Sequence, residues 1–354
     1  RLSWSHLATA AATLLVTLGG MGWLGRAHWS RQRLLVKYAG GETFYEEMRV
    51  EAAERERKRS GDDRGGGTSK SSREDFASAA AFLAAGAPDD ADGALDAVLA
   101  RHPKHARAWH AKAVVHLLYG ELAEARAAAT KAATFAEKTT DSSEKRSSRA
   151  YVDATLGVIR AREGDLEGAA AALESAVSRD ASLAVAHYDL GLVRSRMGDP
   201  EAAKASFAAA LEKAPGYYKA AYALGLCEAT SGRASDAKRR FAAAAAARRR
   251  ALDAHFNLGV LYAREGDVKE AEASFGRCLA VRAKHAPSIV KLGNLLLARG
   301  LPKRAVEKYL VALEIDPDNA EAIANIGVVE WSRAHALEAV SYTHLRAHET
   351  KANL

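Results

Sequence analysis

The sequence predicts an all-α fold, a solenoid built from stacked pairs of helices. Three observations predict it. Apolar residues recur at helical spacing, a glycine interrupts each amphipathic stretch near its middle, and the whole pattern returns every 34 residues over residues 150–319. The composition agrees, because only 7% of the residues are aromatic and only 7 are proline. Such a chain favours closely packed helices over a fold built on sheets.

Residues 1–25 are predicted to form a transmembrane anchor. The segment from Leu7 to Gly25 carries no charge, and its length as a helix just spans a hydrocarbon core of about 30 Å. Trp4 and Trp23 lie near its two ends, where indole rings favour the membrane interface. Basic residues are more numerous after the segment than before it: Arg26, Arg31, Arg33 and Lys37 against Arg1. By the positive-inside rule, the rest of the chain then faces the cytoplasm as a single-pass membrane protein.

Two other interpretations of this segment stay open. A cleaved signal peptide would carry its positive charge before the apolar run, whereas here the charge follows it. A buried helix of a soluble domain would need apolar neighbours, and residues 26–71 offer few.

Residues 26–71 are predicted to form a charged helix followed by a flexible linker. Glu and Arg interleave over 42–59 at a spacing that allows weak ion pairs along a solvated helix. Residues 60–71 contain three consecutive glycines and several serines, which bury too little to order a chain. The linker is the clearest domain boundary in the sequence.

Four positions define each repeat that follows. A small glycine after leucine and a small alanine allow two helices to cross closely, and a large apolar residue fills the space beside the crossing. The Leu-Gly pairs are Leu156-Gly157, Leu190-Gly191, Leu224-Gly225, Leu258-Gly259 and Leu292-Gly293, and Ile326-Gly327 closes the series. The turn glycines are Gly164, Gly198, Gly232, Gly266 and Gly300. The alanines are Ala169, Ala203, Ala237, Ala271 and Ala305, and the large residues are Leu173, Phe207, Phe241, Phe275 and Tyr309.

This pattern strongly resembles the tetratricopeptide repeat (TPR) family, which implies a right-handed superhelical solenoid of helix-turn-helix repeats. Five repeats run without a gap over 150–319, and two degenerate repeats occupy 72–139. Between them, 140–149 is polar and is predicted to be a surface loop. A partial eighth repeat covers 320–339. The tail 340–354 has no repeat signal and resembles a translated sequencing adapter, so we interpret it as non-native.

No catalytic, cofactor-binding or metal motif stands out. The sequence has no phosphate loop, GxSxG, HExxH or CxxC motif. Cys227 and Cys278 fall on apolar helix faces and are expected to be buried. The histidines near residue 110 lie on different helix faces, which argues against a metal site: His102, His105, His110 and His116. Most of the net charge of +7 lies outside the repeats, which disfavours nucleic-acid binding.

The resemblance implies a partner-binding groove lined by the first helix of each repeat. In the family, the residues at positions 2, 5, 6, 9 and 12 point into this groove. Here those positions include His110, Tyr188, Asp189, Tyr222, Asn257, Lys291, Asn294 and Asn325. Asparagine amides can bond a peptide backbone, and Lys291 can pair with a carboxylate. The clamp by which some TPR domains hold chaperone C-termini is incomplete, since Tyr222, Leu226 and Pro287 occupy three of its positions.

The sequence therefore predicts a membrane-anchored TPR scaffold that binds a protein or peptide without catalysis and without a cofactor. The alternative is that the array recruits substrate for a larger enzyme, because some glycosyltransferases resemble this layout. RNA binding is a third hypothesis, which the near-neutral repeats disfavour.

Overall fold

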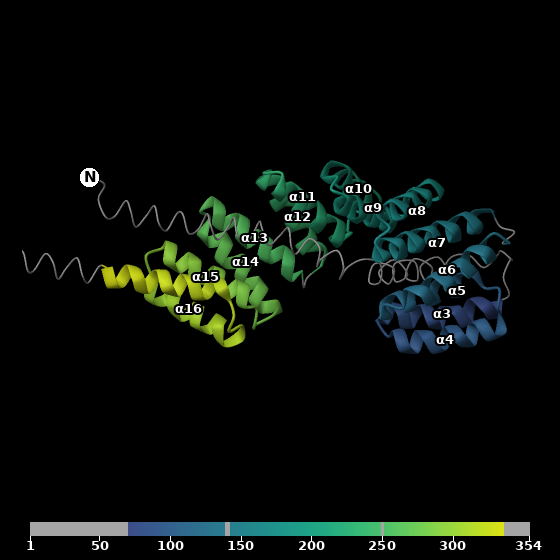
Figure 1. Ribbon diagram of the computed structural model, residues 1–354, viewed down its shortest axis with the longest axis horizontal. Coiled ribbons are helices and arrows are strands. Elements are labelled where there is room, and N and C mark those ends of the chain that lie inside the picture. Colours follow the sequence, from purple (N-terminus) through teal and green to yellow (C-terminus); the bar gives the residue numbers. More distant parts are fainter. Residues whose placement is uncertain (1–69, 139–141, 249–250, 336–354) are drawn as a thin grey trace, which may run out of the picture. The chain divides into compact units, whose positions relative to one another are not determined.

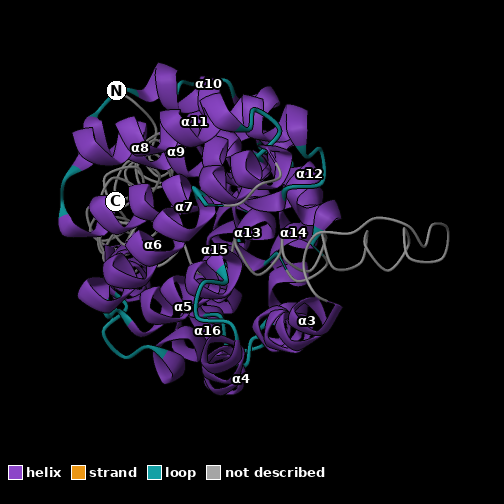
Figure 2. Ribbon diagram, turned by 90° about the vertical axis from the view of Figure 1, so that its right-hand side faces the viewer, coloured by secondary structure: helices purple, strands orange, loops and turns teal. Residues whose placement is uncertain are grey.

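The computed structural model describes residues 70–138, 142–248 and 251–335, and within them the chain is helical with no strand (Figures 1 and 2). The predicted anchor, the charged helix, nearly all of the linker and the tail lie outside these ranges. Among the described helices, none is long and apolar enough to cross a membrane. Lys70 and Ser71, predicted as the end of the linker, already belong to the first turn of a helix.

The helices form successive pairs joined by tight turns, and we call the two members A and B. The A helices are α3 (Lys70–Ala85), α5 (Ala106–Tyr119), α7 (Ser142–Glu163), α9 (Ala184–Met197), α11 (Tyr218–Thr230), α13 (Leu252–Glu265) and α15 (Ala286–Ala298). The B helices are α4 (Pro88–Arg101), α6 (Leu122–Ala136), α8 (Leu166–Arg179), α10 (Pro200–Lys213), α12 (Ala234–Ala247), α14 (Val268–Val281) and α16 (Pro302–Ile315). One more A helix begins at Ala320 and is described as far as His335; we call it the Ala320 helix.

The described residues divide into two compact units, with the division after Cys227. Within each unit, A helices pack on their own B helices, as in α9–α10 of the N-terminal unit and α15–α16 of the C-terminal unit. B helices also pack on the A helix that follows, at α4–α5, α6–α7, α8–α9, α12–α13 and α14–α15. A helices of neighbouring repeats also touch each other directly, at α5–α7, α7–α9 and α13–α15. Side chains on one A helix can therefore reach those on the next.

The turn glycines perform the role that the sequence predicts. Gly266 has φ of 82°, a left-handed conformation that a residue with a Cβ rarely adopts, and it ends α13. The backbone then turns so that the Asp267 amide donates to the carbonyl of Tyr262 at 2.9 Å. Pro200 and Pro302 are the first residues of α10 and α16, where proline costs no intrahelical hydrogen bond.

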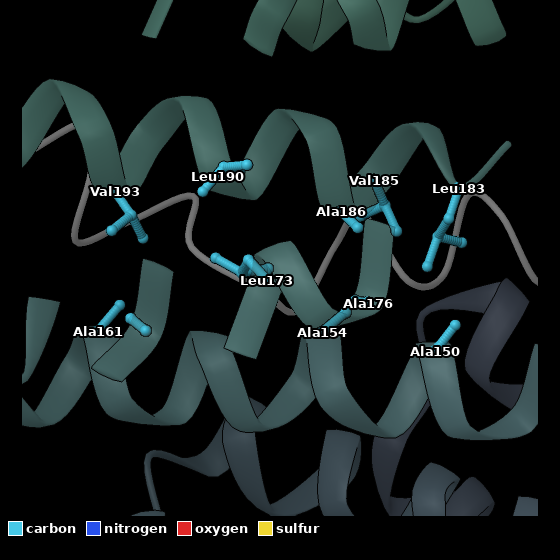
Figure 3. Packing of buried hydrophobic residues seen from close by; sticks show 11 residues of the cluster. Ala150, Ala154, Ala161, Leu173, Ala176, Leu183, Val185, Ala186, Leu190 and Val193 are labelled. Carbon is cyan, nitrogen blue, oxygen red and sulfur yellow. The ribbon is translucent and has the colours of Figure 1, made fainter. Parts of the chain in front are cut away.

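In four of the Leu-Gly pairs, a B-helix side chain occupies the space where a Cβ on the glycine would lie, at Gly157, Gly191, Gly259 and Gly293. A Cβ placed on Gly259 would lie 2.6 Å from the ring of Phe275, and one on Gly293 would lie 2.5 Å from the ring of Tyr309. In the N-terminal unit the corresponding side chain is Leu173, which lies among Ala154, Ala161 and Leu190 (Figure 3). The B-helix alanine is fully buried in every complete repeat, which brings the two backbones close together.

The aspartate that follows the turn glycine does not cap every B helix. Asp267 lies at the N-cap of α14, but its carboxylate makes no capping bond. At the matching position, Asp165 accepts from the Gly168 amide at 2.8 Å. The backbone angles of the two aspartates are nearly equal, φ −80° and ψ 76° against φ −77° and ψ 82°, so the difference lies in the side-chain torsion.

The segment predicted as a polar loop is helical from Ser142 onward. It extends α7 to 22 residues, whereas the other A helices whose two ends are described have 13 to 16. The inserted residues contain neither glycine nor proline, so nothing in them interrupts a helix. Ion pairs hold the extension, with Lys145 at 2.8 Å from Glu137 and Arg149 at 3.2 Å from Asp153. Polarity alone predicted a loop here, but these residues form a solvated helix.

The two cysteines differ in burial, since Cys227 is only half-buried and Cys278 has the predicted packing role. Cys278 is fully buried in the core of the C-terminal unit, and its thiol donates to the Leu252 carbonyl at 3.4 Å. Burial raises the pKa of this thiol to about 11. A thiol with such a pKa stays protonated and unreactive near neutral pH.

Candidate partner-binding site on the A helices

Three of the predicted groove residues meet in one polar cluster of the C-terminal unit. Lys291 and Asn294 come from α15, and Asn325 comes from the Ala320 helix. Glu321 joins them, since its Oε1 accepts from Lys291 Nζ at 2.6 Å and from Asn294 Nδ2 at 2.9 Å. Because Glu321 accepts from both α15 residues, we call this set, with Tyr309, the Glu321 cluster.

Tyr309 connects the cluster to the core. Its ring is buried against Gly293, while its hydroxyl donates to Asn294 Oδ1 at 2.8 Å. Asn325 Nδ2 donates to the same oxygen, also at 2.8 Å. Tyr309 and Asn325 both donate to Oδ1 of Asn294, and Glu321 accepts from its Nδ2. These bonds determine which way the Asn294 amide is turned. Burial, followed by the nearby Glu321 charge, raises the pKa of Tyr309, so its hydroxyl stays a donor.

The cluster is balanced in charge and largely satisfied from within. The side chains of Lys291 and Glu321 are 13% and 27% exposed. A partner carboxylate would have to compete with Glu321 for Lys291, which weakens the predicted role of Lys291 as a carboxylate ligand. The described hydrogen bonds of the cluster do not use the second Glu321 oxygen, the Asn325 carbonyl or the other N–H bonds of Lys291, which form a mixed set of donors and acceptors. Such a set matches the alternating N–H and C=O groups of an extended peptide backbone.

The N-terminal unit carries a related charge arrangement around Asp189. This side chain is buried in α9, and its Oδ1 has no hydrogen-bond partner among the described residues. Burial raises the pKa of Asp189 to about 7, while the positive charges of Lys219 and Arg162 partly oppose the rise. Arg162 of α7 donates to the Leu117 carbonyl of α5 at 2.6 Å, so its guanidinium links two neighbouring A helices.

The two arrangements occupy the same repeat positions with the charges exchanged. Asp189 and Lys291 are both at position 6, three repeats apart, and their partners Lys219 and Glu321 are both at position 2 of the following repeat. The sequence predicted Tyr309 only as a packing residue and did not indicate Lys219, Glu321 or Arg162 as site residues. A search for opposite charges between position 6 of one repeat and position 2 of the next would have found both pairs.

The remaining predicted groove residues are buried or half-buried. Tyr188 is a core residue, with its ring centroid 5.7 Å from that of Phe207 and 5.3 Å from that of Tyr217. Asn257 is buried and Tyr222 is half-buried. Helical position gives the direction in which a side chain leaves its helix, but the size of its neighbours decides how much of it stays exposed.

His110 is buried between A helices of the N-terminal unit. Its Nε2 lies 2.7 Å from the Thr155 hydroxyl, and burial lowers its pKa to about 3, helped by the charge of Arg107. Two of the histidines near it make separate contacts. His105 accepts from the Ala108 amide as the N-cap of α5, and His116 Nδ1 lies 2.7 Å from Glu121. No group of metal-ligating side chains converges within the part of the chain that the structure describes.

Comparison with known proteins identifies the repeats. The family model described as Tetratricopeptide repeat matches residues 76–141, 188–237 and 229–286. The repeats are tetratricopeptide repeats. The first match covers both degenerate TPRs, and the other two fall within the gap-free series.

Solved TPR structures share this fold. One, titled as a functional characterization of Pseudomonas aeruginosa pilF, is 18% identical, covers 62% of this chain and 95% of its own, and has a TM-score of 0.53. The APC/C hetero-tetramer Cut9-Hcn1 gives 17% identity, 66% and 44% coverage, and a TM-score of 0.52. YrrB, titled a TPR protein with an unusual peptide-binding site, gives 24% identity, 49% and 90% coverage, and a TM-score of 0.45. No curated protein matches the chain.

Proposed function

We propose that the TPR array is a non-catalytic scaffold that binds an extended segment of a partner protein along its A helices, with the Glu321 cluster as a principal contact. The observation that carries the proposal is the meeting of Lys291, Asn294 and Asn325 across two neighbouring A helices. These side chains are prearranged by bonds to one another, so binding need not order them first. The hydrogen bond from the buried Tyr309 keeps the Asn294 side chain in place.

The partner best suited to this site is a peptide backbone with side chains of low net charge. The Glu321 oxygen not used by the cluster can accept a backbone N–H, and Lys291 can donate to a backbone carbonyl. Since the cluster carries one positive and one negative charge, neither an acidic nor a basic segment gains from net attraction.

A double substitution tests the site without breaking the Asn294–Tyr309 bond. Lys291→Met with Glu321→Gln removes both charges, while glutamine keeps an oxygen for Asn294. The probes are peptides selected from a random display library for binding to the full chain. They are expected to bind this variant about tenfold more weakly, as measured by fluorescence anisotropy. Truncating a central contact costs about 1–2 kcal/mol or more.

The matched control changes an ion pair between repeats outside the cluster. Arg299 and Glu272 are 2.8 Å apart and lie on an exposed surface. Arg299→Met with Glu272→Gln should leave peptide affinity unchanged. Equal affinities of the selected peptides for the wild type and the Lys291/Glu321 variant would contradict the proposed site.

We also propose that residues 1–25 anchor this scaffold to a membrane, with the array on the cytoplasmic side. The proposal rests on the uncharged run from Leu7 to Gly25 and the basic residues that follow it. Expressed in cells, the full chain should sediment with membranes and resist carbonate extraction. Leu15→Arg should shift it toward the supernatant, because an arginine at the centre of a span costs about 2.5–3.5 kcal/mol. Ala27→Arg is the control, and a full chain recovered without detergent would refute the anchor.

A further inference from the structure

The two units differ in burial on the side of the A helices that carries positions 2, 5 and 6 of the repeat, which we call the inner face. At position 2 of the N-terminal unit, Val185 and Lys219 are 6% and 4% exposed. At the same position of the C-terminal unit, Asp253 and Pro287 are exposed. Position 2 has the same place on every A helix, so the repeat itself does not explain this difference.

The inner face of the N-terminal unit carries excess positive charge and tyrosine rings. Burial raises the pKa of Asp189, and the positive charges of Lys219 and Arg162 oppose the rise. Two positive charges therefore act on one carboxyl group. Tyr151 and Tyr222 are half-buried at positions 2 and 5 of their repeats. A surface of this kind is complementary to an acidic segment that also presents apolar side chains.

Asp189 adds a polar group that can receive a hydrogen bond. Its side chain is 5% exposed, and its Oδ1 has no hydrogen-bond partner among the described residues. A buried acceptor left without a donor costs roughly 1–3 kcal/mol. A hydroxyl or N–H group brought to the inner face would remove this cost.

Residues 42–54 have the chemistry that this face would bind, and they lie outside the described residues. They contain five glutamates and one arginine, a net charge of −4. In the helix that the sequence predicts here, Phe44, Met48 and Ala52 follow each other at intervals of four residues and form an apolar stripe. Glutamates run along one edge of the stripe, so the segment is both acidic and amphipathic.

The connection to the repeats is long enough for the segment to reach this face. Residues 55–69 join it to α3, and when extended they span about 50 Å at roughly 3.3–3.6 Å per residue. Three repeats separate α3 from α9, which is about 30 Å if neighbouring A helices lie about 10 Å apart. A flexible connection of this kind gives an effective concentration on the order of millimolar, so even weak affinity suffices.

We propose that residues 42–54 bind as a helix to the inner face of the chain's own N-terminal unit, across α7, α9 and the start of α11. The apolar stripe packs on the tyrosine rings, and the glutamates face Lys219 and Arg162. The bound segment occupies the N-terminal unit and leaves the Glu321 cluster accessible. A partner that extends along the A helices of both units must first displace the segment, which therefore regulates how much of the array a partner can use.

Photo-crosslinking of the full chain tests the position of the segment. Benzoylphenylalanine in place of Met48 lies on the apolar stripe, whereas in place of Glu46 it lies about 160° away around the helix. Cross-links to peptides of α7, α9 or α11, identified by mass spectrometry, should be at least fivefold more frequent from position 48 than from position 46. In a mixture of chains carrying heavy and light isotopes, these cross-links should join peptides of the same label.

A fluorescent peptide of residues 42–54 measures competition by the segment of the chain itself. Phe44→Gln with Met48→Gln in the full chain removes the apolar stripe, so the peptide should bind this variant at least tenfold more tightly than the wild type, as measured by anisotropy. Val50→Gln with Ala53→Gln changes the opposite face of the segment and is the matched control. It should bind the peptide as weakly as the wild type does.

Further substitutions in the Phe44/Met48 variant locate the bound peptide. Lys219→Met should weaken peptide binding about tenfold, with circular dichroism to verify that the array stays folded. Lys291→Met with Glu321→Gln should leave peptide affinity unchanged, because the cluster belongs to the C-terminal unit. The cross-linking result does not depend on any substitution in the repeats.

Four results would overturn the proposal. They are equal cross-linking from positions 46 and 48, cross-links mainly between heavy and light chains, equal peptide affinity of the wild type and the Phe44/Met48 variant, and loss of peptide binding in the Lys291/Glu321 variant. The second would make the segment of another copy the occupant, and the fourth would place the segment at the Glu321 cluster. The test of the extended-segment site is unaffected, because it uses different peptides and a different control pair.

Discussion

Replacing Phe275 by alanine is expected to lower the free energy of unfolding by about 3–5 kcal/mol, the range for truncating a buried aromatic ring. Phe275 is fully buried, with its ring centroid 5.8 Å from that of Phe256 and its edge against Gly259. Neighbouring repeats cannot refill the space, because the helices that bound it are held in register by their own repeats. Urea denaturation followed by circular dichroism measures the loss.

The partner glycine allows a sharper form of this test. Gly259→Ala alone should destabilise, because its methyl group would overlap a ring held in the core; overpacking typically costs about 1–3 kcal/mol. In the Phe275→Ala background the same change should stabilise, since the overlap is gone and alanine is the better helix former by about 1 kcal/mol. The sign of the effect therefore reverses with the neighbouring residue.

Gly276→Ala on the same repeat is the control for helix propensity. It has open space around it and should stabilise in both backgrounds. If the Gly259→Ala and Phe275→Ala effects simply add, the two residues do not interact and the account of the crossing is wrong.

Stability between pH 4 and pH 8 is expected to reflect two buried groups that act in opposite directions. The pKa of Asp189 is raised to about 7 in the folded protein from 3.8, so the folded state binds more protons over that interval. Stability from Asp189 is thus full below about pH 3.8 and is lost as the pH rises toward 7. The pKa of His110 is lowered to about 3 from 6.5, so its contribution is full above pH 6.5 and is lost as the pH falls.

Single substitutions should separate the pH dependence of stability that comes from Asp189 from that which comes from His110. Asp189→Asn removes the cost of ionising a buried carboxyl, so the variant should gain stability over the wild type as the pH rises from 4 to 7.5, by a few kcal/mol. His110→Gln should gain relative stability in the opposite direction, as the pH falls from 7 to 4. Between pH 4 and pH 6.5 the wild type should be less pH-dependent than either variant, because the two terms oppose each other.

Unfolding temperatures recorded across this range provide the measurement. Asp253→Asn, which changes an exposed carboxylate on α13, is the control and should leave the profile unchanged. Parallel profiles of wild type and Asp189→Asn would show that Asp189 ionises in the folded protein as it does in the unfolded chain.

Several residues of the fold could be assigned from their positions in the repeat because each acts within one helix pair. Gly266 is required by the left-handed turn, and Gly259 and Phe275 form a matched small and large pair. Such requirements recur every 34 residues, and repetition separates them from chance. The inserted helix was missed for the converse reason. It occurs once, and its polar residues fit a loop and a solvated helix equally well until the contacts of Glu137 and Arg149 are known.

The candidate site required more than repeat position. The sequence by itself determined the class of fold, the helix pairs, the close crossings and three members of the polar cluster, because local periodicity encodes which face of a helix each residue occupies. Only the tertiary structure decided that Glu321 binds both Lys291 and Asn294, and that Tyr188 belongs to the core. These facts depend on how neighbouring helices meet, and one repeat read alone contains no information on which polar groups its neighbours satisfy.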